Sequence, residues 1–193
     1  EKAVMAFVKE NEIDVIVNCA AYTAVDKAED NQELCAKRNS EAVGYLAKAA
    51  EENQAEFIQI STDYVFDGTN YVPYRETEPT CPNSVYGVTK LAGEKKALEY
   101  CSKAIIIRTA WLYSVFGNNF VKTMIRLGKE RESLGVIFDQ IGTPTYARDL
   151  ASAVFAAIRK GIIPGIYHFS NEGVCSWYDF TKSIHRIAGI GNC

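Results

Sequence analysis

The sequence predicts an α/β protein built on a doubly wound parallel sheet, and two observations support this prediction. Short apolar runs rich in Ile and Val alternate with longer stretches of helical periodicity, which is typical of strands covered on both faces by crossover helices. The 193 residues are 48% hydrophobic and 23% charged, so the chain can bury one substantial core and part of a smaller lobe.

The expected elements follow one another in this alternating order. Strands are expected at residues 14–21, 56–62, 104–110, 135–138 and 165–170. Helices are expected at residues 33–53, 84–102, 118–130, 148–160 and 176–188. The last helix begins with Ser176, and Asp179 follows three residues later, which indicates a capping box. The character of the sequence changes near "QIGTP", so we place a domain boundary between residues 1–140 and 141–193.

The composition argues against several kinds of partner. A net charge of −3 without a basic face argues against nucleic acid, and no apolar run approaches the roughly 20 residues that span a membrane. The six cysteines form no CxxC pair, and no histidine lies near them at metal-ligand spacing. We therefore expect no metal site and a reduced, cytoplasmic protein. Cys19 lies in an expected strand and is interpreted as a small core residue.

A tyrosine and a lysine four residues apart occur twice, as Tyr86 with Lys90 and as Tyr178 with Lys182. The spacing alone is a weak signal, because an ordinary half-buried aromatic beside a solvated lysine looks the same. Tyr86 and Lys90 differ in context, since they share one helical face after a strand that ends in "STD". The carboxyl ends of strands mark the ligand crevice of an open α/β sheet. Tyr178 is interpreted as a packing residue.

A tyrosine, a lysine and a hydroxyl group in one crevice suit hydride transfer to a carbonyl, because the developing alkoxide needs a proton and a phenol can donate it. An ordinary tyrosine titrates near pH 10. A lysine ammonium about 4 Å away, at an effective dielectric constant near 20, would favour the phenolate by about 4 kcal/mol. We therefore expect the lysine to lower the tyrosine pKa by roughly three pH units.

Several motifs in order carry a family resemblance. "STDYVFDG" followed by "VYGVTKLAGE" resembles the extended short-chain dehydrogenase/reductase superfamily. Within it, "VIVNCAAYTAVDKAE", "RTAWLY", "GNNFVKTM" and "DQIGTPT" are similar to the dTDP-4-dehydrorhamnose reductase family, and the resemblance covers residues 13–180. It implies a Rossmann-like NAD(P)-binding domain in residues 1–140 and part of a substrate-binding lobe in residues 141–193.

The resemblance implies an activity as well as a fold. Family members reduce the C4 keto group of dTDP-4-dehydro-L-rhamnose to dTDP-L-rhamnose with hydride from NADPH or NADH, in deoxysugar and cell-surface polysaccharide biosynthesis. The implied partner is therefore a dTDP-sugar substrate, and the resemblance also allows a homodimer. Some members place a glutamate magnesium ligand where this chain has Arg148, so no metal is expected.

The resemblance further implies roles for individual residues. Tyr86 would be the general acid, and Lys90 would lower its pKa while binding the nicotinamide ribose hydroxyls. Thr62 would hydrogen-bond the sugar carbonyl, Asp63 would lie beside it against the substrate, and Trp111 would pack on the deoxysugar ring. The implied cofactor-binding residues are Ala21, Tyr22, Thr23, Ile60, Tyr86 and Lys90. Asn39 is interpreted as a cap or packing residue as readily as a cofactor contact.

The chain departs from the family pattern at both ends. The resemblance implies an earlier strand, glycine-rich turn and helix, and a further carboxy-terminal portion. Neither GxGxxG nor GxxGxxG occurs in the 193 residues. Because that turn binds the dinucleotide phosphates, we expect these residues alone to bind the cofactor poorly and to be inactive.

Two alternatives to the reductase stay open. A nucleotide-sugar epimerase or dehydratase of the same superfamily would keep the tyrosine and lysine, although a dehydratase would want an acidic pair where Thr62 and Asp63 stand. A non-catalytic protein resembling the regulatory subunit of methionine adenosyltransferase would act by binding a partner. Thr62 and Trp111 favour the reductase over this binding role.

Overall fold

The computed structural model describes residues 1–191 and residue 193, and the chain divides into two compact units. Unit 1 comprises Glu1–Thr109 and Ala156–His168, and unit 2 comprises Ala110–Phe155 and Phe169–Cys193. The chain leaves unit 1 after Thr109 and returns to it inside a helix. The boundary expected after residue 140 therefore falls within unit 2.

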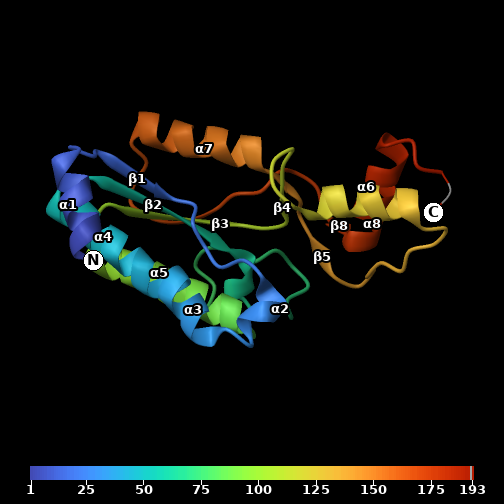
Figure 1. The fold of residues 1–193 in the computed structure, drawn as a ribbon, viewed down its shortest axis with the longest axis horizontal. Helices are drawn as coiled ribbons and strands as arrows, with labels where there is room; N and C mark the ends of the chain where they lie inside the picture. Colours follow the sequence, from blue (N-terminus) through green and yellow to red (C-terminus); the bar gives the residue numbers. More distant parts are fainter. Residues whose placement is uncertain (192) are drawn as a thin grey trace. The chain divides into compact units, whose positions relative to one another are not determined.

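Unit 1 is built on a four-stranded parallel sheet with the order β1-β2-β3-β7. Its strands are β1 (Val15–Asn18), β2 (Glu56–Thr62), β3 (Ala104–Thr109) and β7 (Gly165–His168). Thr62 lies beside Thr109 at the carboxyl edge of the sheet. Figure 1 shows helices α4 (Ala42–Glu52) and α5 (Val85–Tyr100) on one face of the sheet. The predicted α/β class with a parallel sheet is confirmed.

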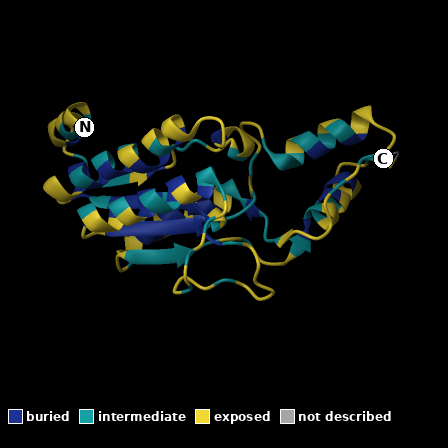
Figure 2. Cartoon of the chain, turned by 90° about the horizontal axis from the view of Figure 1, so that it is seen from below, coloured by how far each residue is buried: buried dark blue, intermediate teal, exposed yellow. Residues whose placement is uncertain are grey.

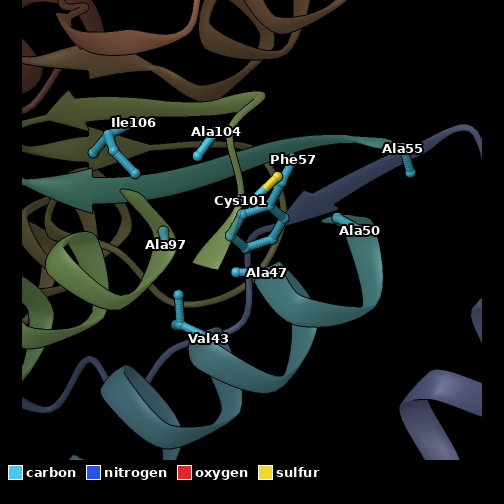
Figure 3. Packing of buried hydrophobic residues seen from close by; sticks show 9 residues of the cluster. All are labelled: Val43, Ala47, Ala50, Ala55, Phe57, Ala97, Cys101, Ala104 and Ile106. Carbon is cyan, nitrogen blue, oxygen red and sulfur yellow. The ribbon is translucent and has the colours of Figure 1, made fainter. Parts of the chain in front are cut away.

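The hydrophobic core of unit 1 lies between the sheet and helices α4 and α5. Phe57 is completely buried at its centre, among mostly small side chains (Figure 3), namely Val43, Ala47, Ala50, Ala55, Ala97, Cys101, Ala104 and Ile106. Three of these recur on α4 at helical spacing, so one face of this helix is small enough to approach the strands closely. Figure 2 shows that the central strands are buried whereas the outer faces of the helices are exposed.

The helix expected at residues 33–53 is present but interrupted. It consists of α3 (Gln32–Ala36), a π-helical turn (Lys37–Glu41) and α4. The π turn widens the helix by one residue per turn and buries Asn39 and Ser40. The remaining helices that lie wholly in unit 1 are α1 (Lys2–Glu10), α2 (Val25–Ala28) and a 3₁₀ turn (Asp63–Val65).

Unit 2 combines helices with two small sheets. Its helices are α6 (Phe120–Glu130), the first part of α7 (Ala147–Lys160) and α8 (Trp177–Ile187). Strand β4 (Leu112–Tyr113) pairs in parallel with β6 (Thr145–Tyr146), and β5 (Ile141–Gly142) pairs antiparallel with β8 (Cys175–Ser176).

The capping box predicted in unit 2 is confirmed, and a second helix of this unit is also capped by a side chain. The Ser176 hydroxyl accepts the Asp179 backbone N–H at 3.0 Å, and the Asp179 carboxylate accepts the Ser176 N–H at 3.1 Å, which completes the capping box. Asn119 caps α6, because its Oδ1 accepts the Lys122 N–H at 3.2 Å. These caps satisfy backbone donors that the first turn of a helix leaves unpaired.

Two expectations about local structure are wrong. Residues 135–138 form no strand; Ile137 and Phe138 are 51% and 69% exposed, so this apolar run is not covered as a buried strand would be. Cys19 follows β1 and is exposed, because the strand ends at Asn18, whose side-chain oxygen accepts the Ala20 N–H at 3.1 Å. In the described part of the chain, no helix combines the length and apolar character needed to cross a membrane.

Candidate active site

The candidate site of unit 1 lies where β2 ends. Thr62 is the last residue of this strand, and Asp63 begins the 3₁₀ turn that follows it. The Thr62 hydroxyl accepts the Tyr64 backbone N–H at 3.2 Å and donates to the Asp63 carboxylate at 3.0 Å. This pair of hydrogen bonds fixes the rotamer of Thr62 at the carboxyl edge of the sheet, where ligands bind in open α/β folds.

Tyr86 lies in the first turn of α5, and its phenol lies close to the Thr62 side chain. The turn is fixed by Ser84, whose hydroxyl accepts the Gly87 N–H at 3.1 Å. A Cβ atom at Gly87 would lie 2.2 Å from the Tyr64 carbonyl oxygen, so only glycine allows this turn to approach the end of β2 so closely. The structure therefore brings Tyr86 and Thr62 together, while their catalytic roles stay a prediction.

The environment of Tyr86 raises the pKa of its phenol to about 12. Burial is the main cause, because the phenolate would lose its hydration, and the nearby Asp63 carboxylate adds to the effect. The neighbouring Thr62 side chain acts in the opposite direction and lowers the pKa. The expected lowering by Lys90 is not observed, since the groups that shift the Tyr86 pKa are these and the neighbouring Tyr64 and Cys35.

Lys90 is buried, with 4% of its surface exposed, and its ammonium donates a hydrogen bond to the Ile60 carbonyl at 2.6 Å. Burial lowers the pKa of Lys90 to about 8, and the charge of Glu94 partly offsets this effect. The Lys90 ammonium is thus held against β2 at Ile60, which precedes Ser61 and Thr62 in this strand. Because its pKa is about 8, this buried amine is mostly protonated at pH 7 and loses its proton at slightly higher pH.

Asn39 positions the segment in which cofactor-binding residues are expected. The Tyr22 backbone N–H donates to Asn39 Oδ1 at 2.7 Å, and Asn39 Nδ2 donates to the Tyr22 carbonyl at 3.1 Å. Asn39 Nδ2 also lies 3.2 Å from the Thr89 hydroxyl on α5. One buried amide therefore ties residues 21–23 to the helix that carries Tyr86 and Lys90. Ala21 and Tyr22 are half-buried and Thr23 is exposed.

Trp111 belongs to unit 2 and sits in an aromatic cluster. Its ring stacks on Trp177 with centroids 3.5 Å apart and an angle of 13° between the planes. The backbone of Trp111 has a φ of +48°, an uncommon conformation for a bulky residue. A Cβ atom at Gly142 would lie 2.6 Å from the indole, so glycine is required beside it. One face of the ring is thus covered by Trp177.

Comparison with known proteins relates this arrangement to a family. Residues 1–192 match the family described as the RmlD substrate binding domain. The chain belongs to this family. Its relatives include the dTDP-4-dehydrorhamnose reductases of Escherichia coli K12, at 50% identity over 184 residues, and Salmonella typhimurium LT2, at 47% identity over 196 residues. These alignments cover 92% and 98% of this RmlD-family chain but 62% and 66% of the two relatives.

Solved structures of similar proteins agree with this assignment. The dTDP-4-dehydrorhamnose reductase of Bacillus anthracis, solved in complex with NADP, has a TM-score of 0.96 and 43% identity, with coverage of 100% of this chain and 68% of that one. The orthologue from Clostridium acetobutylicum has a TM-score of 0.95 and 48% identity, covering 98% and 67%. Of the E. coli and Salmonella relatives, this RmlD-family chain spans 62% and 66%, which is less than two thirds of their length.

Sequence reasoning missed two buried polar residues that hold this RmlD-family site together, Glu94 and Arg108. Both carried a usable signal. Arg108 interrupts the otherwise apolar strand "AIIIRT", and a charge in a buried strand requires a partner. Glu94 follows Lys90 by four residues and therefore shares its helical face. Asn39 was left open between a packing residue and a cofactor contact, and its burial was not predictable because it depends on the π turn.

Proposed function

We propose that the complete protein carrying this chain is a reductase. It converts the C4 keto group of dTDP-4-dehydro-L-rhamnose to the alcohol of dTDP-L-rhamnose, with hydride from NADPH or NADH. The names of the similar proteins and the NADP bound to the B. anthracis relative support this proposal. The structural observation that carries it is the position of the Tyr86 phenol beside the Thr62 side chain at the carboxyl edge of the sheet.

The residues around Lys90 fit the nicotinamide end of a dinucleotide. An ammonium has three N–H donors, and the Ile60 carbonyl accepts one of them, so Lys90 can also donate to ribose hydroxyls. Residues 21–23 lie after the carboxyl end of β1, on the edge of the sheet where ligands bind, and Asn39 fixes their backbone at Tyr22. The bound dinucleotide would supply the hydride.

Tyr86 supplies the proton in this proposal. With a pKa of about 12 the phenol is protonated at neutral pH, so the proton is available before the carbonyl is reduced. An alkoxide is a stronger base than a phenolate, so transfer from the phenol to the developing alkoxide is downhill even at this pKa. The Thr62 side chain lowers the Tyr86 pKa and so favours the phenolate that results.

Substrate contacts complete the proposal. Thr62 would bind the sugar carbonyl, with Asp63 beside it. Burial raises the pKa of Asp63, because the carboxylate would lose its hydration. Trp111 would pack on the deoxysugar ring, and its stacking on Trp177 would hold the indole in one orientation. A homodimer and a cytoplasmic location stay predictions.

The proposal is tested with the complete protein, dTDP-4-dehydro-L-rhamnose and either NADPH or NADH. We expect loss of the reduced-nucleotide absorbance and formation of dTDP-L-rhamnose. Exclusive turnover of a different nucleotide sugar would favour the epimerase or dehydratase alternative. An absence of turnover with both nucleotides, together with capture of a methionine adenosyltransferase by the purified protein, would replace the reductase with the non-catalytic binding role.

A further inference from the structure

Three side chains on one face of α5 contact three consecutive residues of β2. Tyr86 lies beside Thr62, Lys90 donates to the Ile60 carbonyl at 2.6 Å, and Glu94 accepts the Ser61 hydroxyl at 2.5 Å. Side chains four residues apart are neighbours along a helix. The contact at Glu94 therefore helps to determine where Tyr86 lies along the strand.

Glu94 is anchored more firmly than the other two residues, because it also pairs with Arg108 on β3. The Arg108 Nε lies 3.0 and 3.2 Å from the two carboxylate oxygens, and Nη2 donates to Oε2 at 2.7 Å. Glu94 and Arg108 are only 1% and 4% exposed. A buried, multiply hydrogen-bonded ion pair has a fixed geometry and is disrupted strongly when one partner is removed. Glu94 thus connects α5 to two strands at once.

The charge of Glu94 also acts on Lys90. Burial lowers the pKa of Lys90, and Glu94 is the first of the groups that raise it; the others are Cys19 after β1 and Cys35 on α3. Arg108, on β3, is paired with the Glu94 carboxylate from the opposite side. The glutamate therefore compensates two buried cations, one through direct hydrogen bonds and one through its field.

We propose that Glu94 is a positioning residue of the site: it fixes α5 along β2 so that Tyr86 meets Thr62, and its negative charge compensates the buried Lys90 ammonium. The catalytic consequence rests on the proposed reductase function. The docking of α5 and the protonation of Lys90 are properties of the fold and are measurable without turnover.

The test uses Glu94→Gln in the complete protein, with ¹³Cε-labelled lysine followed by NMR as a function of pH and Lys90→Met to assign the signal. Glutamine keeps the shape but loses the charge, so we expect Lys90 to titrate about one pH unit lower or more. The alkaline limb of kcat/KM should move in the same direction. Glu99→Gln is the matched control, because Glu99 lies on the same helix and is exposed; it should move neither.

A second variant covers the case in which Arg108, left without its partner, prevents folding. Glu94→Gln combined with Arg108→Met removes both buried charges, a replacement that cores often tolerate, and should retain the lowered Lys90 titration. An unchanged Lys90 titration in either folded variant would overturn the proposal, as would a loss of rate at all pH values with no movement of the alkaline limb. If Lys90 shifts while the wild-type protein reduces no sugar nucleotide, the charge role stands and the proposed function fails.

Discussion

Lys90 places a positive charge in the interior of the protein, and this destabilises the fold at neutral pH. Its side chain is almost fully buried, and burial lowers its pKa from 10.5 to about 8. A depression of this size corresponds to about 3 kcal/mol between the charged and neutral forms. Because strongly perturbed ionisable groups cluster at functional sites, the position of Lys90 supports its proposed role in binding the cofactor.

Replacing Lys90 with methionine should therefore stabilise the protein, while abolishing the proposed reductase activity. Lys90→Met is expected to raise the free energy of unfolding at pH 7 by about 1–3 kcal/mol, since the lost hydrogen bond to Ile60 offsets part of the gain. Between about pH 8 and 10.5 the unfolded lysine holds its proton while the folded one loses it, so the wild type gains stability as the pH rises.

Urea unfolding of both proteins between pH 7 and 10 measures this effect. The stability difference should shrink steadily as the pH increases. Lys95→Met is the control, because Lys95 is exposed on the same helix and should change stability little at any pH. A difference between Lys90→Met and wild type that is the same at pH 7 and pH 10 would contradict the assigned environment of Lys90.

Tyr86 marks the limit of what residue spacing can predict. The sequence correctly indicates that Tyr86 and Lys90 share a helical face after a strand ending in Thr62. The sequence does not reveal how deeply the Tyr86 phenol is buried. It also does not reveal that the Ile60 carbonyl accepts a hydrogen bond from the Lys90 ammonium. Both features depend on how α5 packs on the sheet. Burial of the phenol is the main reason why the Tyr86 pKa rises, whereas we expected Lys90 to lower it.

At the level of elements, α5 is fitted closely against the backbone of its neighbours. A Cβ atom at Gly93 would lie 2.1 Å from the Asn39 carbonyl oxygen in the π turn. No side chain can rotate away to relieve this contact, because the neighbouring atom belongs to the backbone. Gly93 is therefore a structural requirement of the contact between α5 and the π turn, which in turn holds Asn39 against Tyr22.

Gly93→Ala should lower the free energy of unfolding by about 1–3 kcal/mol through overpacking, even though alanine favours a helix by about 1 kcal/mol over glycine. Gly44→Ala on α4 is the matched control, because its Cβ would meet side chains and no backbone, namely Lys96 at 3.2 Å and the Tyr100 ring at 3.3 Å. This control should be neutral or slightly stabilising. Denaturant unfolding compares the two variants, and equal stabilities would show that the predicted clash is absent.

A strand or helix was predictable from the sequence where its apolar pattern matches its burial in the folded chain. The strand at 56–62 is matched residue for residue by β2, because an apolar run buried on both faces has a clear signature. The run at 135–138 has similar composition but lies exposed, and composition does not reveal whether another element covers a segment. The π turn at Lys37–Glu41 was hidden because a single extra residue hardly changes helical periodicity over a helix of this length.

At the scale of the whole molecule, the sequence predicted the parallel sheet and the strand end that carries the site. It did not predict the division into units, because unit 1 is assembled from two separate stretches of chain, and such a division depends on long-range contacts. The ion pair between Glu94 and Arg108 was likewise not predictable, because the two residues lie on different elements and meet only when α5 packs on β3. The resemblance to a family supplied roles that physical reasoning alone left open.

The rate of ketone reduction by Tyr86→Phe in the complete protein tests the central claim most directly. The phenylalanine variant keeps the ring but has no proton to donate, so we expect kcat to fall about 10²–10⁴-fold while substrate binding stays nearly unchanged. Tyr178→Phe is the matched control, because Tyr178 begins the other tyrosine–lysine pair and is 43% exposed; it should retain the wild-type rate. A Tyr86→Phe protein that reduces its substrate as fast as the wild type would contradict the assignment of Tyr86 as proton donor.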